Sequence, residues 1–168
     1  NIHDGFRRAV KRNNEQTRTV VIDGQNIAFW PCSENSPKDW NLVISAARYY
    51  YDKGISVVVF LPTHFFHKFD DDYKKTLRKY CVIQTVDCGN DKEMDDKLVV
   101  GYATIEDCYY LSNDKRMCNH FKQNNLQTRA WCEKRRIEFE FDEQGSFNPK
   151  SDPFKKNELI VDDSEVTV

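Results

Sequence analysis

The strongest constraint on the fold is the stretch at residues 55–61, in which every side chain except Ser56 is apolar. Such a run is typical of a strand that is buried on both faces, and strands of this kind belong mainly to parallel sheets covered by helices. Shorter β-type runs at residues 18–22, 81–86 and 108–111 alternate with helical patterns. The alternation predicts an α/β fold, a three-layer α/β/α, Rossmann-like architecture around a central, mostly parallel sheet.

Three segments between these runs have helical spacing. The first follows an N-cap signature at residues 36–39 and ends at Gly54. The second, residues 70–79, starts acidic and ends basic, which complements a helix dipole. The third follows a turn-rich loop at residues 87–91. Its predicted buried stripe consists of Leu98, Val99, Tyr102 and Ala103, and Asp95 lies on the same stripe.

The late part of the chain carries two further signals. A helix is expected after Asp114, and residues 137–142 alternate apolar and acidic side chains, which predicts a half-exposed edge strand. We divide the chain into a basic N-terminal arm (1–17), one folded domain (18–154) and an acidic C-terminal tail (155–168).

Composition fits a single domain of an intracellular protein. With 39% hydrophobic and 13% aromatic residues, the 168 residues suffice for a sizeable core. No apolar run approaches the roughly 20 residues needed to span a bilayer, and the polar N-terminus does not resemble a signal peptide. The six cysteines are scattered without a C-x-x-C pair, so we expect reduced, mostly packed thiols.

An aspartate lies at the end of two of the predicted strands. Asp23 directly follows the first strand, and Asp114 follows the fourth. If these strands are neighbours at the point where the strand order reverses, their carboxyl ends place both side chains in one crevice. The pair Asp95 and Asp96 opens the helix that leads into the fourth strand, so it can reach the same place.

Carboxylates packed this closely repel one another unless a cation is present. Mg²⁺ or Mn²⁺ suits such hard oxygen ligands, and it could activate water against a phosphodiester. Taken singly, each feature has a simpler explanation: a tight turn at Asp23, helix-dipole charges at Asp95 and Asp96, and a helix cap at residues 112–114. The order of the three features favours a metal site.

The same residues carry a family resemblance. The chain resembles the PIN-like (NYN) nuclease domain of the Zc3h12a or Regnase type, with a coverage of about residues 19–154. The motifs that carry it are residues 20–28, 58–62, 94–98 and 111–114, with a C-terminal stretch at 139–142, 147–149 and 152–153.

The resemblance implies a Mg²⁺-dependent endoribonuclease, with Mn²⁺ as an alternative, that cleaves single-stranded or stem-loop RNA to leave a 5′-phosphate and a 3′-hydroxyl. Asp23, Asp96 and Asp114 would hold the metal, Asp95 would support it, and Asn26 would orient substrate or water. It further implies a role in mRNA decay or RNA silencing, in the cytoplasm or RNA granules, with the nucleus as an alternative.

Two departures from the family pattern bear on activity and RNA binding. Cys118 stands where the family often has a further aspartate, so one outer contact to the metal is expected to be missing. The loop at residues 87–91 is short and acidic where relatives have a long basic one. With a net charge of −2, positive charge must be local. The expected RNA contacts are Lys92, Lys97, Lys115, Arg116, Lys134, Arg135 and Arg136.

The resemblance also implies that such domains can form a homodimer. The lack of a nearby zinc-finger pattern implies that targeting comes from protein partners or from regions outside this sequence. Two other functions fit the residues. A catalytically weak or inactive RNA-binding scaffold would explain Cys118 and the acidic loop, and metal-dependent turnover would exclude it. A metal-dependent phosphatase for small substrates shares the carboxylates, and competition by long RNA would argue against it.

Overall fold

The computed structural model describes residues 18–33, 35–91, 93–121 and 126–154. The predicted N-terminal arm, the predicted C-terminal tail and Lys92 therefore lie outside the described residues. Within the described part of the chain, no helix is long and apolar enough to cross a membrane.

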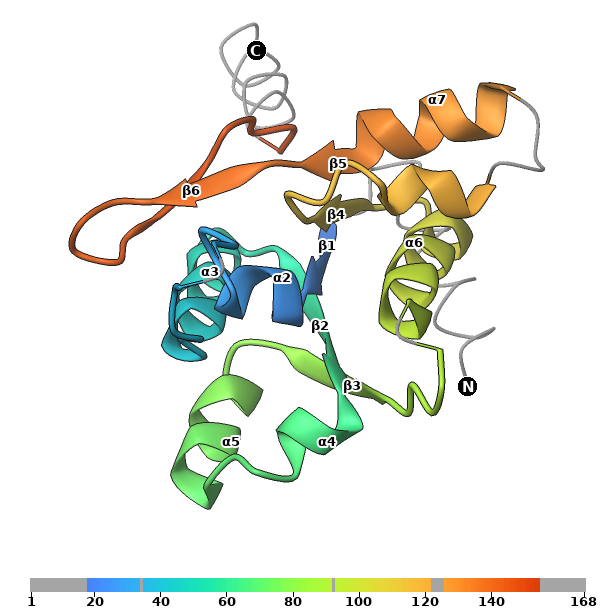
Figure 1. The fold of residues 1–168 in the computed structure, drawn as a ribbon. Helices are drawn as coiled ribbons and strands as arrows, with labels where there is room; N and C mark the ends of the chain where they lie inside the picture. The colour runs from blue at the N-terminus through green and yellow to red at the C-terminus, as the bar shows by residue number, and fades with distance from the viewer. Residues whose placement is uncertain (1–17, 34, 92, 122–125, 155–168) are drawn as a thin grey trace, which may run out of the picture.

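A parallel sheet of five strands forms the centre of the domain (Figure 1). The strands are β1 (Thr19–Asp23), β2 (Ser56–Pro62), β3 (Val82–Val86), β4 (Tyr109–Leu111) and β5 (Arg136–Ile137). Their order in space is β3-β2-β1-β4-β5. The sheet therefore extends from β1 through β2 to β3 on one side, and β4 and β5 are added on the other side of β1. Because β1 pairs with β4, the predicted neighbourhood of the first and fourth strands is confirmed.

Helices cover both faces of the sheet, as Figure 1 shows, and the predicted three-layer α/β fold is confirmed. The helices are α2 (Gly24–Ala28), α3 (Asn41–Asp52), α4 (Thr63–Phe66), α5 (Asp71–Arg78), α6 (Met94–Glu106), the 3₁₀ helix η1 (Met117–Phe121) and α7 (Leu126–Arg135). Successive side chains of β1 point to opposite faces of the sheet, so they pack into the two hydrophobic cores in turn. Val20 and Ile22 pack in the core that α3 covers, whereas Val21 packs in the core that α6 and η1 cover.

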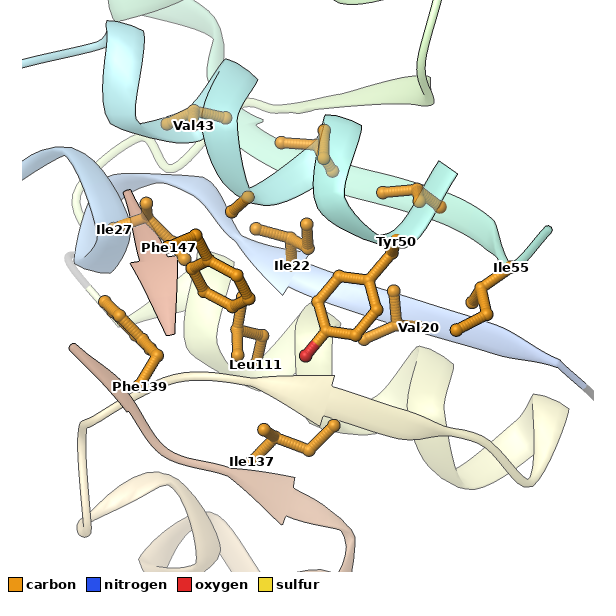
Figure 2. Close-up of a cluster of buried hydrophobic side chains, with 14 of the residues drawn as sticks. Val20, Ile22, Ile27, Val43, Tyr50, Ile55, Leu111, Ile137, Phe139 and Phe147 are labelled. Carbon is orange, nitrogen blue, oxygen red and sulfur yellow. The ribbon is translucent and has the colours of Figure 1, made fainter. Parts of the chain in front are cut away.

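The core under α3 extends into a C-terminal hairpin. The strands β6 (Phe139–Phe141) and β7 (Phe147–Pro149) pair antiparallel outside the main sheet. Phe139 and Phe147 lie beside Tyr50 of α3 and Leu111 of β4 (Figure 2). The ring centroids of Tyr50 and Phe147 are 5.6 Å apart. The hairpin is therefore part of the hydrophobic core.

Two predicted boundaries need correction. The helix predicted from residues 36–39 begins at Asn41, and Asp39 accepts a hydrogen bond from the Asn41 backbone N–H at 3.0 Å. The single edge strand predicted at residues 137–142 is divided at Glu138 into β5 and β6. The alternation itself holds in β6, since both of its phenylalanines are buried and the glutamate between them is exposed.

The predicted stripe on α6 was wrong by part of a turn. The side chain of Leu98 is 44% exposed. The buried side chains of the helix are Asp95, Val99, Val100, Ala103 and Glu106. Asp95, Val99 and Ala103 are therefore buried as predicted, whereas Val100 and Glu106 are buried in addition.

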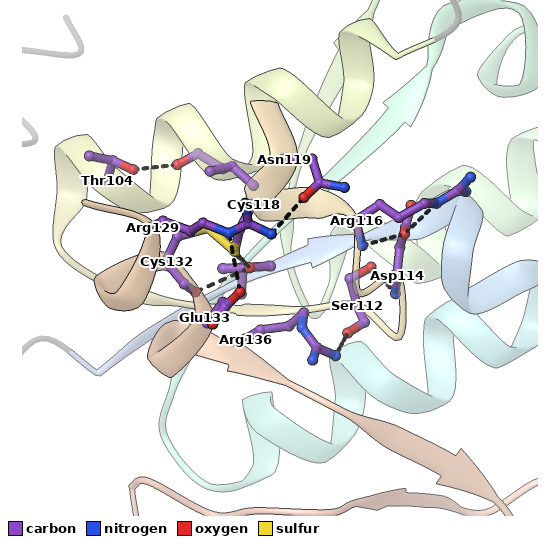
Figure 3. Close-up of a disulfide and its surroundings, with 12 residues drawn as sticks. Thr104, Ser112, Asp114, Arg116, Cys118, Asn119, Arg129, Cys132, Glu133 and Arg136 are labelled. Carbon is purple, nitrogen blue, oxygen red and sulfur yellow. Dashed lines mark hydrogen bonds and ion pairs between the residues drawn. A yellow bond between two sulfur atoms is a disulfide. The ribbon is translucent and has the colours of Figure 1, made fainter. Parts of the chain in front are cut away.

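The expectation of reduced thiols was wrong for two cysteines. Cys118 of η1 and Cys132 of α7 form a disulfide, with Cα atoms 5.9 Å apart (Figure 3). The Tyr110 hydroxyl lies 3.3 Å from each sulfur. The two cysteines are 14 residues apart in sequence, and they meet only because η1 and α7 pack together over the α6 side of the sheet. Cys108 is a buried free thiol, as expected.

Candidate active site

The site is built around Asp23, the last residue of β1. This residue is buried, and its carboxylate caps α2 by accepting a hydrogen bond from the Asn26 backbone N–H at 3.4 Å. Its other oxygen accepts a hydrogen bond from the Ser112 hydroxyl at 3.2 Å. Gly24 lets α2 start directly against β2, because a Cβ at this position would lie 2.8 Å from the Phe60 carbonyl oxygen. The short helix thus fixes the carboxylate at the end of the strand.

The first turn of α6 brings two more carboxylates to the same place. Asp23, Asp95 and Asp96 each offer an oxygen, and these atoms all lie within 4.8 Å of one another. Asp95 is 5% exposed, whereas Asp96 is only partly buried. Among the described residues, this group has the spacing expected of ligands that share one metal ion.

The loop after β4 closes the site on the opposite side. Ser112 is fully buried, and its hydroxyl also accepts a hydrogen bond from the Asp114 backbone N–H at 3.1 Å. The Asn113 backbone N–H donates to Asn26 Oδ1 at 2.8 Å. Asp114 receives hydrogen bonds from the backbone and side chain of Arg116, which Figure 3 shows beside it. A network of side chains thus connects this loop to α2.

These residues surround a cavity of about 320 Å³ at the carboxyl edge of the sheet. Asp114 lines the cavity although it lies outside the tight carboxylate group. The lining residues are Asp23, Gln25, Asn26, Phe29, Cys32, Ser33, Ser36, Asp95, Asp96 and Asp114. The cavity therefore combines five of the residues that the sequence analysis selected: the four aspartates and Asn26.

Electrostatic strain is concentrated in the carboxylates. Burial, and then the charges of Asp95 and Asp114, raise the pKa of Asp96 to about 7. Burial, and then the charges of Asp96 and Asp95, raise the pKa of Asp23 well above its ordinary value. The pKa of Asp95 is raised as well, mainly by burial. The carboxylates of Asp23, Asp95 and Asp96 are therefore costly to ionise, so a cation among these three would be strongly favoured.

The basic residues expected to contact RNA are distributed unevenly around this cavity. Arg116 pairs with Asp114 at its edge, and Arg136 binds Glu138 at 2.9 Å and the Ser112 carbonyl at 3.4 Å. Arg135 instead binds Asp107, which precedes β4, so it lies toward the opposite edge of the sheet.

Three lysines complete the comparison. Lys97 is exposed and pairs with Asp91 at 2.9 Å. Lys115 lies in the exposed part of the loop after Asp114, and Lys134 is exposed on α7. Arg116, which pairs with Asp114, is the predicted contact at the edge of the cavity, and Lys97 and Lys115 directly follow the lining residues Asp96 and Asp114 in the chain. Lys92 lies outside the described residues.

Sequence reasoning gave no role to four cavity residues, Gln25, Cys32, Ser33 and Ser36, whose only sequence signal is proximity to Asp23. Gln25 comes from α2, and the other three come from the loop after that helix. Phe29, the C-cap residue of α2, was considered from the sequence only as an aromatic residue near a strand end that could stack a base. Ser112 was considered only as a helix cap, and the structure instead makes it the bridge between β1 and the loop after β4.

Comparison with known proteins agrees with this geometry. Residues 16–163 match the family of Zc3h12a-like ribonuclease NYN domains. The chain belongs to this family. Membership of this family supports a function as an RNA-cleaving nuclease. Nucleases of the family typically use a divalent metal. No curated protein matches the chain by sequence.

Solved structures show the same fold for the NYN domain. A crystal structure of nuclear proteinaceous RNase P 2 (PRORP2) from Arabidopsis thaliana matches 89% of the chain with a TM-score of 0.62 and 11% sequence identity. A second structure of Arabidopsis PRORP2 matches with a TM-score of 0.61. The chain spans 33% and 36% of the length of these two chains, so the likeness concerns about a third of each.

Proposed function

We propose that this NYN domain is a metal-dependent endoribonuclease. It hydrolyses phosphodiester bonds in single-stranded or stem-loop RNA and leaves a 5′-phosphate and a 3′-hydroxyl. One observation carries the proposal: three carboxylates with oxygens within 4.8 Å share a buried site where the strand order of an α/β sheet reverses. Ligands bind such sheets at this place.

The residues of the cavity fit a divalent cation. All four acidic side chains offer hard oxygen ligands, which suit Mg²⁺ with Mn²⁺ as an alternative. The raised pKa values of Asp23 and Asp96 fit an ion that offsets their charges. We assign Asp23, Asp95 and Asp96 as the residues that hold it, because their oxygens form the tight group, with Asp114, which lines the same cavity, as a supporting carboxylate. This exchanges the roles that the sequence analysis gave to Asp95 and Asp114. A bound divalent ion would polarise the phosphodiester and lower the pKa of water.

Other residues around the cavity position these carboxylates and the substrate. The Ser112 hydroxyl and the Asn26 backbone N–H hold the Asp23 carboxylate in one orientation. The Oδ1 atom of Asn26 is engaged by the Asn113 N–H, so its amide nitrogen is the group it offers to a phosphate or a water. Arg116, next to Asp114, can approach a substrate phosphate from the rim of the cavity.

Cleavage of an end-labelled single-stranded RNA tests this function. Wild-type protein, Asp23→Asn and Asp96→Asn are incubated with Mg²⁺, Mn²⁺ or EDTA. Internal cuts that require metal and disappear in both variants are expected. RNA binding without cutting by the wild type would favour the scaffold function instead. Turnover of a small phosphomonoester that long RNA does not inhibit would favour a phosphatase.

We further propose that this activity serves mRNA decay or RNA silencing, in the cytoplasm or RNA granules, with the nucleus as an alternative. The proposal includes a homodimer and targeting by protein partners.

A further inference from the structure

The substrate strand can leave the acidic cavity toward either edge of the sheet, and the two directions differ in charge. Toward β3 lies a second cavity of about 610 Å³, lined by residues of α2, of α4 and of the ends of β2 and β3. The segment after β3, residues 87–93, carries three acidic side chains and one lysine. Its net negative charge disfavours a phosphate backbone on this side.

Toward β5, three cations surround the carboxylate of Glu138, which lies between β5 and β6. Arg136 Nη1 is 2.9 Å from Glu138 Oε1, and Lys150 Nζ is 3.8 Å from Glu138 Oε2. The pKa of Glu138 is lowered, first by its hydrogen bond with Arg136 and then by the charges of Arg136, Lys115 and Lys150, so Lys115 also acts on this carboxylate. We call these four residues the Glu138 cluster. Three cations against one carboxylate leave it with a charge of +2.

The Glu138 cluster is joined to the acidic cavity through the loop after β4. Arg136 donates a hydrogen bond to the Ser112 carbonyl at 3.4 Å, as Figure 3 shows. Lys115 directly follows Asp114, which lines the cavity. The backbone N–H of Lys150 donates to the Glu138 carbonyl at 2.8 Å, which fixes the base of the hairpin beside β5. A strand with one phosphate at the carboxylates can therefore bring a nearby phosphate to the cluster.

The side chains of the cluster suit a phosphate. Arg136 is 14% exposed and forms a fixed base, whereas Lys150 is 54% exposed and Lys115 is exposed as well. Arginine and lysine bind phosphate oxygens through the same charge-assisted hydrogen bonds that they form with a carboxylate. Glu138, whose two oxygens meet two different cations, thus occupies the place of a phosphate. Ion pairs this close to solvent are weak, so the carboxylate can be displaced.

We propose that Lys115, Arg136 and Lys150 form a phosphate-binding site for the RNA strand, and that Glu138 occupies this site in the free protein. The inference rests on the proposed nuclease function and adds the course of the substrate, which runs from the carboxylates over the loop after β4 to the base of the hairpin. A backbone phosphate is common to every nucleotide, so the site adds affinity without base preference. The competing explanation is an ion-pair network that only stabilises the hairpin.

The first experiment measures RNA affinity of Lys150→Met and Glu138→Gln. The probe is a short, labelled, single-stranded RNA, and its binding is followed by fluorescence anisotropy in EDTA at several KCl concentrations. Lys75→Met and Asp72→Asn are matched controls, because they make the same changes of charge at exposed positions of α5. Thermal unfolding of each variant reports on the fold separately.

Lys150→Met should weaken binding about 2- to 5-fold, the range for loss of one exposed ion pair. The slope of log K against log[KCl] should become shallower by about 0.7, the value for one phosphate contact on a single strand. Glu138→Gln should strengthen binding by a similar factor, because it removes the anion that competes with the phosphate. A role confined to the hairpin cannot produce this gain. Lys150→Arg and both controls should retain the wild-type affinity.

A second experiment locates the contact on the RNA. Each linkage near the mapped cut is replaced in turn by an uncharged methylphosphonate, with a 2′-O-methyl sugar at that position in the modified and the unmodified RNA. One linkage on one side of the cut should weaken binding to the wild type and should have almost no effect on Lys150→Met.

The proposal is overturned if Lys150→Met binds RNA with the affinity and salt slope of the wild type, or if Glu138→Gln does not bind more tightly than the wild type. Failure of the nuclease function is a separate result. Binding in EDTA requires no turnover, so the affinities of these variants decide on the phosphate site even if the wild type cuts no RNA.

Discussion

Asp96→Asn is expected to stabilise the metal-free protein while it abolishes cleavage. The pKa of Asp96 rises from 3.8 to about 7 on folding, chiefly by burial and then by the charges of Asp95 and Asp114. At about 1.4 kcal/mol per pKa unit, this corresponds to roughly 4 kcal/mol lost from the free energy of unfolding above pH 7. The side chain is only partly buried, and solvent screening reduces the value to about 2 kcal/mol.

The pH dependence follows from the same shift. Between pH 4 and pH 7 the folded protein keeps a proton on Asp96 that the unfolded chain has lost, so its stability falls as the pH rises through this window. Asparagine does not titrate, so the variant should lose this part of the slope. The gain in stability should be greatest at pH 8 and should disappear toward pH 4, where the aspartate is protonated in both states.

Thermal unfolding in EDTA measures the effect. For a domain of this size, 2 kcal/mol corresponds to a rise in Tm of about 6 °C at pH 8. Mg²⁺ at about 100 times its Kd should stabilise the wild type by about 2.7 kcal/mol and should have a much smaller effect on the variant. Asp72→Asn is the matched control, because this aspartate lies exposed in the first turn of α5. It should lower stability slightly and leave cleavage unchanged.

Two results would refute the reasoning. One is an Asp96→Asn protein that is no more stable than the wild type at pH 8 in EDTA, which would mean that the carboxylate is not under strain. The other is a variant that still cuts RNA, which would remove Asp96 from the site.

Three further predictions concern the framework. Gly24→Ala should lower stability by about 1 to 3 kcal/mol through overpacking, whereas Gly101→Ala in the open middle of α6 should raise it by about 0.5 to 1 kcal/mol; chemical denaturation measures both. Asn113→Ala removes two hydrogen bonds to the backbone of β6 and should lower stability by about 1 to 3 kcal/mol and slow cleavage at temperatures well below the Tm. A thiol reductant should lower stability by about 3 kcal/mol through loss of the Cys118–Cys132 crosslink, and a variant with alanine at both positions should not respond to it.

Much of the fold could be predicted because its strongest signals are local. The apolar run of β2, the acid-to-base gradient of α5 and the alternation in β6 each depend on the chemistry of a few neighbouring residues. On α6 the apolar spacing misjudged Leu98, which is exposed, whereas Asp95 is buried on the stripe as predicted. Spacing shows which residues share a helix face, but the neighbouring segments decide how much of that face is covered.

Some contacts between distant segments could be predicted and others could not. The meeting of Asp23, Asp96 and Asp114 was expected from two strand ends, a helix start and a family resemblance, and all three line one cavity. The disulfide depends on how η1 packs against α7, and the second cavity depends on how α4 lies beside α2. Neither arrangement leaves a fixed spacing in the sequence.

The C-terminal hairpin connects the core to the chemistry of the site. Asn113 exchanges two hydrogen bonds of 2.9 Å with the backbone of Phe139, and Phe139 is 1% exposed in the core shown in Figure 2. The Asn113 N–H in turn holds Asn26. The position of the Asp114 loop is therefore set by a hairpin that lies outside the main sheet and contributes no residue to the cavity. A change that loosens this hairpin should reduce cleavage before it unfolds the domain, because the loop depends on a few hydrogen bonds whereas the sheet depends on the whole core.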